Sequence, residues 1–380
     1  MHDKLNNTSG ASSRSSASST SSKSGMSDVS SKGINTLESS QSLSHCSDTL
    51  HKNPLSEGKL LQNTLFNFPF PDLTFSEFFI NLRLYEDSPF LKESFLGAAL
   101  RGAVMNRAKY LLCANKKSFN DCSKCILVQK CIYAQLFETK QRANAEIMKK
   151  YREIPHPFIM TPLLKQNGSS NLSVRIVLFG EFIEYFPYFY FVFKSMEERK
   201  KYKVLSVQNF DRNILNGDKL IAPFARRSST DFINKATGNI IQENSEVEVT
   251  FLTPLRIKKN GKLVNPTTFD FQSFLTNVLR RITLLSYFYG KEWGVSGKDV
   301  RNIISLASSV RIVKNELGWL ELERYSSRSK TFMPMGGIVG KVVLSKEASK
   351  FIPFLRLGQY TQVGKNTSFG HGYYTIKLIL

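Results

Sequence analysis

A loop near the C-terminal end of the chain has the residue types that suit a phosphate ligand. It reads Gly364-Lys-Asn-Thr-Ser-Phe-Gly-His-Gly372 and lies between two apolar, strand-like runs. Glycine lets a backbone approach a ligand closely and adopt positive φ at little cost. Backbone N–H groups in such a loop, together with the charge of Lys365, are suited to binding phosphate. A plain hairpin turn explains the same glycines, so the loop alone leaves both interpretations open.

Four cysteines form the second group of residues that could bind a ligand. Their spacing is C-x8-C-x2-C-x5-C, within nineteen residues, and they are Cys113, Cys122, Cys125 and Cys131. Four thiolates at such spacing can close a tetrahedral zinc site. A [4Fe–4S] cluster and reduced thiols without a ligand are the alternatives. With Cys46 the count of cysteines is five, and an odd number argues against a disulfide framework. We expect a structural zinc that plays no part in catalysis.

The charge of the chain predicts a polyanionic partner. The 380 residues include 52 Lys and Arg against 31 Asp and Glu, which gives a net charge of +21. Residues 1–66 contribute six basic and five acidic groups, so 46 against 26, or +20, belong to the rest. Nucleic acid is the first candidate for such a surface, and a membrane surface is the alternative.

Composition also predicts the domain organisation and the compartment. Residues 1–50 contain 18 serines and few aliphatic residues, so we expect residues 1–65 to be a disordered tail. The remainder predicts one domain over 66–243, with the cysteines in an insertion, and a second over 244–380. No apolar run reaches the ~18 residues that a bilayer span needs, and the N-terminus lacks the apolar core of a signal peptide. We expect a cytoplasmic protein with no membrane partner.

Both predicted domains show the same succession of strands and helices. In the first, a run of strand formers over 73–85 precedes apolar positions at helical spacing over 95–112. In the second, an alternating run over 247–252 precedes a helical pattern over 271–289. The stretch from Lys140 to Arg152 is basic and compatible with a further helix. The repeated pattern predicts an α+β fold with tandem ferredoxin-like (RRM-like) domains.

Several segments, taken in their order, resemble one family. This family comprises the CRISPR-associated endoribonucleases that process precursor CRISPR RNA, within the repeat-associated (RAMP) superfamily, in the branch with a glycine-rich C-terminal domain. Any one segment is a weak signal, but the ordered set is specific and covers roughly residues 70 to 380. The segments are Phe95-Leu-Gly-Ala-Ala-Leu-Arg-Gly-Ala103, Cys131-Ile-Tyr-Ala-Gln-Leu-Phe137, Pro155-His-Pro-Phe158, Phe251-Leu-Thr-Pro-Leu-Arg256, Arg280-Arg281, Arg324-Tyr-Ser-Ser-Arg-Ser-Lys330, Gly336-Gly-Ile-Val-Gly340 and Leu357 to Gly372.

The resemblance implies cleavage of a repeat RNA without a metal. In that reaction a ribose 2′-hydroxyl attacks the adjacent phosphate and leaves a 2′,3′-cyclic phosphate. The reaction needs a base, an acid and cations for the developing negative charge, and a histidine suits proton transfer near neutral pH. The family pattern has a histidine where this chain has Gln362, which cannot exchange protons near pH 7.

His371 is our candidate to stand in for the missing histidine, and Tyr360 and Lys365 are further catalytic candidates. A solvent-exposed loop histidine is the alternative for His371, and a rigid turn is the interpretation of His156 between two prolines. Basic clusters with aromatic neighbours are typical of RNA binding. The candidate RNA-binding residues are Arg256, Lys258, Arg281, Arg324, Arg328, Lys330, Gln362, Gly364, Lys365, Gly370 and Gly372.

Three classes of function are therefore compatible with the sequence. The first is a CRISPR endoribonuclease that cuts within a repeat. The second is a non-catalytic subunit of the same fold that binds guide RNA inside an effector complex with other CRISPR-associated subunits. The third, a zinc-stabilised DNA-binding or scaffold protein, explains the charge and the cysteines but not the ordered motifs.

Overall fold

The structure, a computed structural model, describes ten stretches of the chain. They are residues 72–93, 95–115, 121–140, 145–149, 151, 153–164, 170–232, 245–290, 297–326 and 330–379. The predicted disordered tail, residues 1–65, lies outside them, and so do Arg328 and the predicted domain boundary at 243–244. The tail and the boundary therefore stay predictions.

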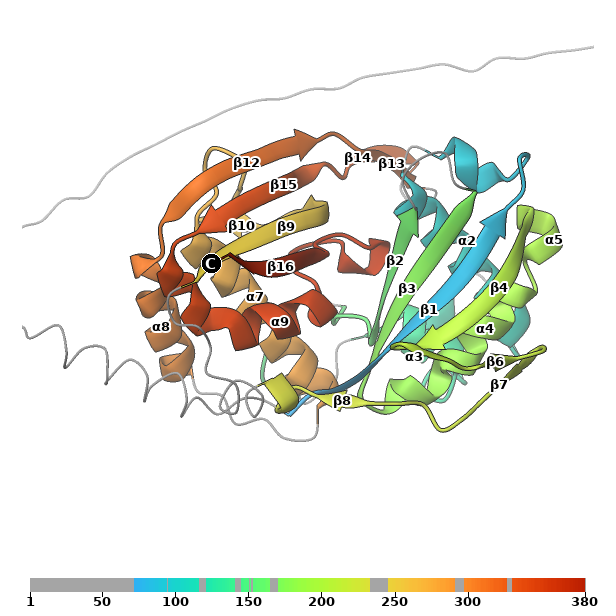
Figure 1. Cartoon of the computed structure of the whole chain (residues 1–380). Helices are drawn as coiled ribbons and strands as arrows, with labels where there is room; N and C mark the ends of the chain where they lie inside the picture. The colour runs from blue at the N-terminus through green and yellow to red at the C-terminus, as the bar shows by residue number, and fades with distance from the viewer. Residues whose placement is uncertain are drawn as a thin grey trace, which may run out of the picture. The chain divides into compact units, whose positions relative to one another are not determined.

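The first sheet contains the N-terminal strands in the order β2-β3-β1-β4-β5, and its strands pair antiparallel (Figure 1). The chain runs strand, helix, strand, strand, helix, strand, which is the ferredoxin-like succession. These elements are β1 (Thr74–Leu84), α2 (Leu96–Leu112), β2 (Phe158–Leu164), β3 (Asn171–Phe179), α4 (Phe186–Lys194), β4 (Tyr202–Asn209) and the short β5 (Arg212–Asn213).

Alternation along β1 determines which face of this sheet is buried. Phe78, Ile80 and Leu82 are fully buried, while the residues between them are partly exposed. Successive side chains of a strand point to opposite faces, so one face of β1 can pack against helices. The ring of Phe78 stacks on that of Phe186 at the start of α4, with their centroids 3.7 Å apart.

The second sheet repeats this topology with the order β12-β15-β9-β16, again antiparallel. Its elements are β9 (Glu246–Leu255), α7 (Phe271–Tyr289), β12 (Ile312–Leu320), β15 (Gly337–Leu344), α9 (Ile352–Thr361) and β16 (Tyr374–Ile379). In each sheet the fourth strand of the motif lies beside the first. The predicted α+β class with tandem ferredoxin-like repeats is thus confirmed.

Short elements connect these units. The helical ones are η1 (Pro89–Lys92), η3 (Cys122–Lys124), α3 (Ile132–Phe137), η4 (Gly180–Tyr185), α5 (Glu197–Lys200), α8 (Gly297–Leu306), η5 (Ala307–Ser309), η6 (Lys346–Phe351) and η7 (Thr367–Phe369). The short strands are β6 (Leu215–Asn216), β7 (Lys219–Leu220), β8 (Arg227–Ser228), β10 (Lys258–Lys259), β11 (Lys262–Leu263), β13 (Glu323–Ser326) and β14 (Thr331–Pro334). The stretch over 140–152, which the sequence left open to a helix, is not helical in its described part, and Lys140 pairs with Glu153 in an isolated bridge.

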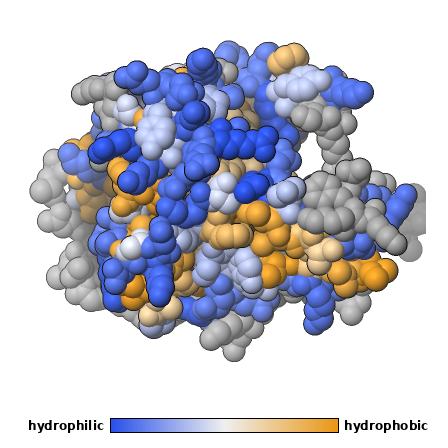
Figure 2. Space-filling model, turned by 90° about the vertical axis from the view of Figure 1, so that its right-hand side faces the viewer, coloured by the Kyte–Doolittle hydropathy of each residue, from blue (hydrophilic) through white to orange (hydrophobic). Residues whose placement is uncertain are grey.

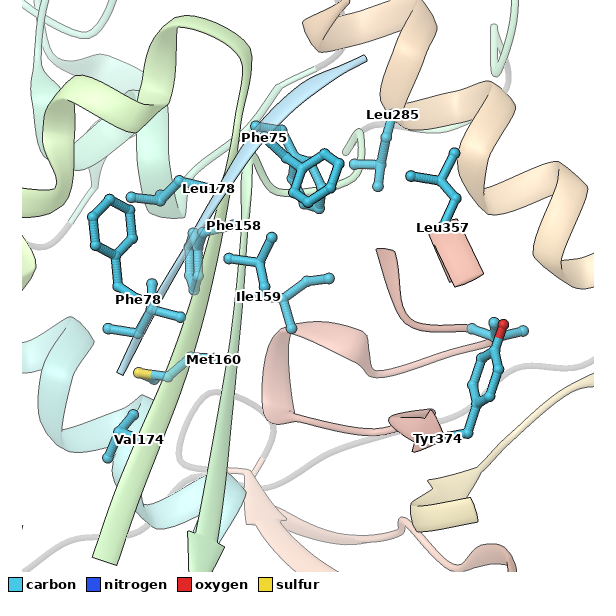
Figure 3. Packing of buried hydrophobic residues seen from close by; sticks show 14 of the residues in the cluster. Phe75, Phe78, Phe158, Ile159, Met160, Val174, Leu178, Leu285, Leu357 and Tyr374 are labelled. Carbon is cyan, nitrogen blue, oxygen red and sulfur yellow. The ribbon is translucent and has the colours of Figure 1, made fainter. Parts of the chain in front are cut away.

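The buried apolar side chains of both sheets belong to one contiguous cluster. Figure 3 shows members from the first sheet, such as Phe78 and Ile159, together with Leu285 of α7, Leu357 of α9 and Tyr374 of β16. Hydrophilic residues cover much of the face shown in Figure 2, with an apolar area among them. Within the described stretches, no helix is both long and apolar enough to cross a bilayer.

Candidate nucleic-acid interface

The glycines of the C-terminal loop are required by the packing of the chain on itself. Gly364 and Gly372 have φ values of +91° and +73°, in the left-handed region that favours glycine. A Cβ on Gly372 would lie 1.9 Å from the carbonyl oxygen of Val363, and one on Gly364 would lie 2.6 Å from that of Arg256. These glycines therefore permit close approach of backbone to backbone, rather than of backbone to ligand.

Helix α2 packs directly against this loop. The carbonyl oxygen of Phe369 lies only 2.1 Å from where a Cβ of Gly97 would be. On the other side of the loop, a Cβ on Gly370 would lie 3.1 Å from the carbonyl oxygen of Met160 and from Cα of Thr161, both in β2. The loop of the second ferredoxin-like unit is thus held by a helix and a strand of the first.

A cleft of about 1030 Å³ opens beside this contact. Its walls come from α2, the segment 153–156, the hairpin β13–β14 and the loop tip, residues 366–369. Tyr325 and Phe332 of the hairpin line it with 52% and 70% of their surfaces exposed, and their rings lie 5.3 Å apart. Exposed aromatic rings beside cations are a common means of holding single-stranded RNA.

Two guanidinium groups meet on the ring of Phe369 inside the cleft. The Cζ atoms of Arg101 and Arg324 each lie 4.6 Å from its centroid, which is a cation–π distance. Burial, followed by repulsion from Arg324, lowers the pKa of Arg101 to about 10. Burial likewise lowers the pKa of Arg281 to about 10. Arg101 and Arg281 nevertheless carry their charge at neutral pH.

These arginines are held without a direct carboxylate partner. Arg101 is 8% exposed and Arg281 is 9% exposed, and Arg281 donates from Nε to the carbonyl oxygen of Thr361 at 3.2 Å. No salt bridge joins either of them, or Arg324, to a carboxylate in the part of the chain that the structure describes. The cleft also has four glutamates, of which three are exposed and Glu138 is half-buried: Glu93, Glu138, Glu153 and Glu323. The interior of the cleft is therefore more cationic than its rim.

His156 lies beside Arg101 in this cleft, with both ring nitrogens engaged. Its Nε2 is 3.0 Å from Nη2 of Arg101, and its Nδ1 is 3.1 Å from Oγ1 of Thr139. The Thr139 hydroxyl donates its one proton to the carbonyl oxygen of Ile154 at 2.9 Å. Thr139 must therefore accept from Nδ1–H, so His156 is neutral and its Nε2 lone pair faces Arg101.

The electrostatic surroundings keep His156 neutral. Burial, then the charges of Arg101 and Arg281, lower its pKa to about 3, while a backbone hydrogen bond with Leu136 acts in the opposite direction. The interpretation of His156 as a rigid turn residue is incomplete, because the side chain connects α2 to the segment that follows α3.

The three predicted catalytic residues do not line the cleft. His371 is fully buried, its Nε2 donates to the carbonyl oxygen of Met335 at 2.7 Å, and burial lowers its pKa. Tyr360 accepts from Nη1 of Arg227 at 2.9 Å, and its ring lies 4.8 Å from that of Phe75. Lys365 is exposed. The burial of His371 favours a structural role over proton transfer.

The predicted RNA-binding residues divide into three groups. Arg281 and Arg324 line the cleft. Lys258 and Lys330 are exposed away from its lining, and Arg256 donates to the carbonyl oxygen of Gly336. Gly364, Gly370 and Gly372 face the protein itself, as the distances above show, and the buried amide of Gln362 donates to the hydroxyl of Thr161. None of this tests RNA binding directly, so these assignments stay predictions.

The four cysteines lie near one another without forming a metal-holding group. Cys113 is 3.4 Å from the carbonyl oxygen of Asn115, whose Nδ2 is 3.6 Å from Cys125 Sγ. The charges of Cys131 and Cys113 act on Cys122, although burial is the main cause of its raised pKa. Across the described stretches no three His, Cys, Asp or Glu side chains are arranged to hold a metal ion. The thiol arrangement does not by itself fit a zinc site, and zinc stays a prediction.

Two features of the cleft were missed from sequence, although signals were present. Arg101 lies in the motif Phe95 to Ala103, where helical periodicity predicts a position off the buried face, whereas the side chain is buried. Phe369 lies inside the glycine loop, and its ring contacts the guanidinium groups of two arginines. An aromatic residue among glycines and beside Lys365 was the sequence feature that could have pointed to it.

Fold and cleft together define a tandem ferredoxin-like protein with an arginine-lined, aromatic-rimmed cleft, a form suited to RNA. Residues 249–374 match the model of the family described as CRISPR-associated endoribonuclease Cas6. Residues 73–223 match a second model, described as an N-terminal domain. The chain is thus Cas6-like over residues 249–374, which confirms the resemblance inferred from the ordered motifs.

Solved structures show the same fold at low sequence identity. A partial Cas6-RT-Cas1–Cas2 complex contains a chain that is 14% identical, with a TM-score of 0.51, over 82% of this chain and 47% of that one. This chain thus spans under half of that protein. Thermus thermophilus Cas6 is 12% identical, with a TM-score of 0.46, over 80% of this chain and 99% of its own. No curated protein shows a detectable match to the sequence.

Proposed function

We propose that this protein is a metal-independent endoribonuclease that cuts precursor CRISPR RNA within its repeat and holds the RNA in the arginine-lined cleft. One observation carries the proposal. Arg101, Arg281 and Arg324 lack carboxylate partners at salt-bridging distance in the described stretches and converge beside a neutral histidine. Buried cations without partners are costly and are commonly found at functional sites.

The reaction needs a proton acceptor and cations, and the cleft offers both. The ribose 2′-oxygen forms a bond to the adjacent phosphorus while the bond from phosphorus to the 5′-oxygen breaks, which leaves a 2′,3′-cyclic phosphate. His156 takes the 2′-proton at Nε2, since it is the histidine that lines the cleft in the described part of the chain. The arginines stabilise the negative charge that develops on the phosphate. We assign protonation of the leaving 5′-oxygen to Lys200, the lysine of the lining.

The partners follow from the same family likeness. We propose repeat RNA as the ligand and other CRISPR-associated subunits as assembly partners, since the similar chain with the TM-score of 0.51 belongs to a complex of Cas6-RT-Cas1 with Cas2. Assembly with such subunits is proposed for this chain rather than shown, because it spans under half of that protein. A subunit that binds guide RNA without cutting it is the alternative function, and Gln362 in place of the family's histidine was the signal for it in the sequence.

Incubation with the repeat RNA of its own locus in EDTA tests the proposal. We expect 5′ fragments that end in a 2′,3′-cyclic phosphate. His156→Ala should lower the cleavage rate by about 10²-fold or more while RNA binding persists. His371→Ala is the control, since His371 is a buried histidine outside the cleft lining, and should retain cleavage. If the parent protein binds the RNA but leaves it intact, the protein is not an endoribonuclease. If it prefers duplex DNA, repeat RNA is not its ligand.

A further inference from the structure

Arg101 has hydrogen-bonding capacity that the protein itself does not use. Its Nη2 is bonded to His156, and its Nη1 lies 2.6 Å from the sulfur of Met105, a weak acceptor. Its Nε has no partner among the described residues, although the side chain is only 8% exposed. A buried cation in this state costs free energy that an anion would recover.

The groups around Arg101 suit a phosphate. Arg324 lines the cleft and lies against the same ring of Phe369. The two guanidinium groups repel each other, and an anion bound to both would relieve this repulsion. Phe369 fixes their positions without neutralising them. A guanidinium group presents several N–H donors in one plane, which match two oxygens of a phosphate.

We propose that Arg101 and Arg324 form a phosphate subsite and that a phosphate bound there releases Nε2 of His156 from Arg101. The proposal rests on the proposed function in taking this phosphate to be one of RNA. Arg101 then turns its Nη2 proton from the imidazole to a phosphate oxygen. The subsite makes the proton acceptor available only when its substrate is in place.

The anchor on the other ring nitrogen makes this release productive. The Nδ1–H bond to Thr139 persists, so the imidazole keeps its orientation when Nε2 becomes free. Accepting a proton at Nε2 gives an imidazolium ion with Nδ1–H unchanged, and the bound phosphate supplies the opposite charge nearby. The charged groups that face His156 are Arg101 from α2 and Arg281 from α7. Its neutral neighbours are the Thr139 hydroxyl, the Leu136 backbone and the ring of Phe158 in β2, which stacks on the imidazole.

Nuclear magnetic resonance of histidine-labelled protein tests the subsite without RNA cleavage. The probe is inorganic phosphate, with chloride at equal ionic strength as its reference, and His156→Gln assigns the resonance. In chloride the His156 resonances should not titrate between pH 5 and 8. Saturating phosphate should change the Nε2 resonance and bring the midpoint of titration above pH 5. The second probe is a 2′-deoxy repeat oligonucleotide, which cannot be cut. It shows whether a phosphodiester of the repeat acts on His156 as free phosphate does.

Substitutions link the effect to the subsite. Arg101→Met should abolish the response to phosphate, whereas Arg107→Met on the same helix, outside the cleft lining, should leave it intact. If Arg101→Met does not fold, Arg324→Met tests the same subsite without touching His156 and should weaken phosphate binding about tenfold. Phosphate that binds without changing the His156 resonances, or a response that survives Arg324→Met unchanged, overturns the proposal. A response to phosphate in a protein that leaves repeat RNA intact upholds the subsite and overturns the proposed function alone.

Discussion

The side-chain amide of Gln362 donates to the hydroxyl of Thr161, 201 residues earlier in the chain, at 2.5 Å. Both side chains are fully buried, so the bond joins the end of α9 to β2 inside the protein. Gln362 also has φ +51°, outside the usual range for a residue with a side chain. Position 362 is thus a structural link between the two ferredoxin-like units, and a histidine there would lie against Thr161 rather than in the cleft.

Gln362→His should therefore leave the rate of RNA cleavage within about twofold, while it lowers the free energy of unfolding. The expected loss is about 1–2 kcal/mol, the usual cost of a broken buried hydrogen bond. Denaturant unfolding and cleavage of repeat RNA measure the two effects. Thr161→Val, which removes the other partner, should show a similar loss of stability. A tenfold gain in cleavage by Gln362→His would show that position 362 reaches the substrate.

Two glycines of α2 give a matched test of how the loop is held. Gly97→Ala should destabilise the protein, because the new Cβ would collide with the carbonyl oxygen of Phe369, 2.1 Å away. Gly102→Ala, one and a half turns later, meets nothing within 4 Å and should stabilise the helix by about 0.5–1 kcal/mol. Thermal unfolding of the two variants should move the melting temperature in opposite directions. Equal shifts would mean that the loop moves away from α2 at little cost.

The sequence predicted the fold better than the site, and the reason is physical. Strand alternation and helical spacing are local patterns, and the core faces of β1 and α7 follow from them. The cleft depends on Arg101 and His156, which lie 55 residues apart and meet only through tertiary packing. The prediction that the glycine loop binds a phosphate also depended on tertiary packing. A local sequence cannot show whether a glycine makes room for a ligand or, as at Gly372, for the backbone of the chain itself.

Lys365 and Arg324 separate two predictions about where RNA is held. Lys365→Ala removes an exposed charge and should reduce the salt dependence of repeat-RNA binding by about one phosphate's worth of slope. Arg324→Ala removes a charge within the cleft and should also lower cleavage. Binding measured over a series of salt concentrations gives both slopes. A Lys365→Ala variant with an unchanged slope would place the RNA away from the glycine loop.

The zinc prediction has a direct measurement. If the four cysteines close around zinc, protein purified without added chelator should contain about one zinc per chain, and its removal should lower the melting temperature because metal binding contributes to folding. Cys122→Ser should then release the metal. Elemental analysis that finds no bound metal would reject the prediction, and visible absorbance of the iron–sulfur type would replace zinc with a cluster.

Stability should fall in mild acid, in part because of His156. Its pKa in the folded protein is lowered to about 3 from an ordinary value of 6.5. Between these values the unfolded chain binds a proton that the folded protein does not, so the free energy of unfolding decreases as the pH falls below 6.5. The slope from this one group is at most about 1.4 kcal/mol per pH unit. His156→Gln should flatten the dependence of the melting temperature on pH between 6.5 and 4.5, with little change at pH 8 beyond a constant offset. Parallel curves for parent and variant would show that the pKa of His156 in the folded protein is close to its ordinary value of 6.5. They would remove the lowered pKa that phosphate is proposed to reverse.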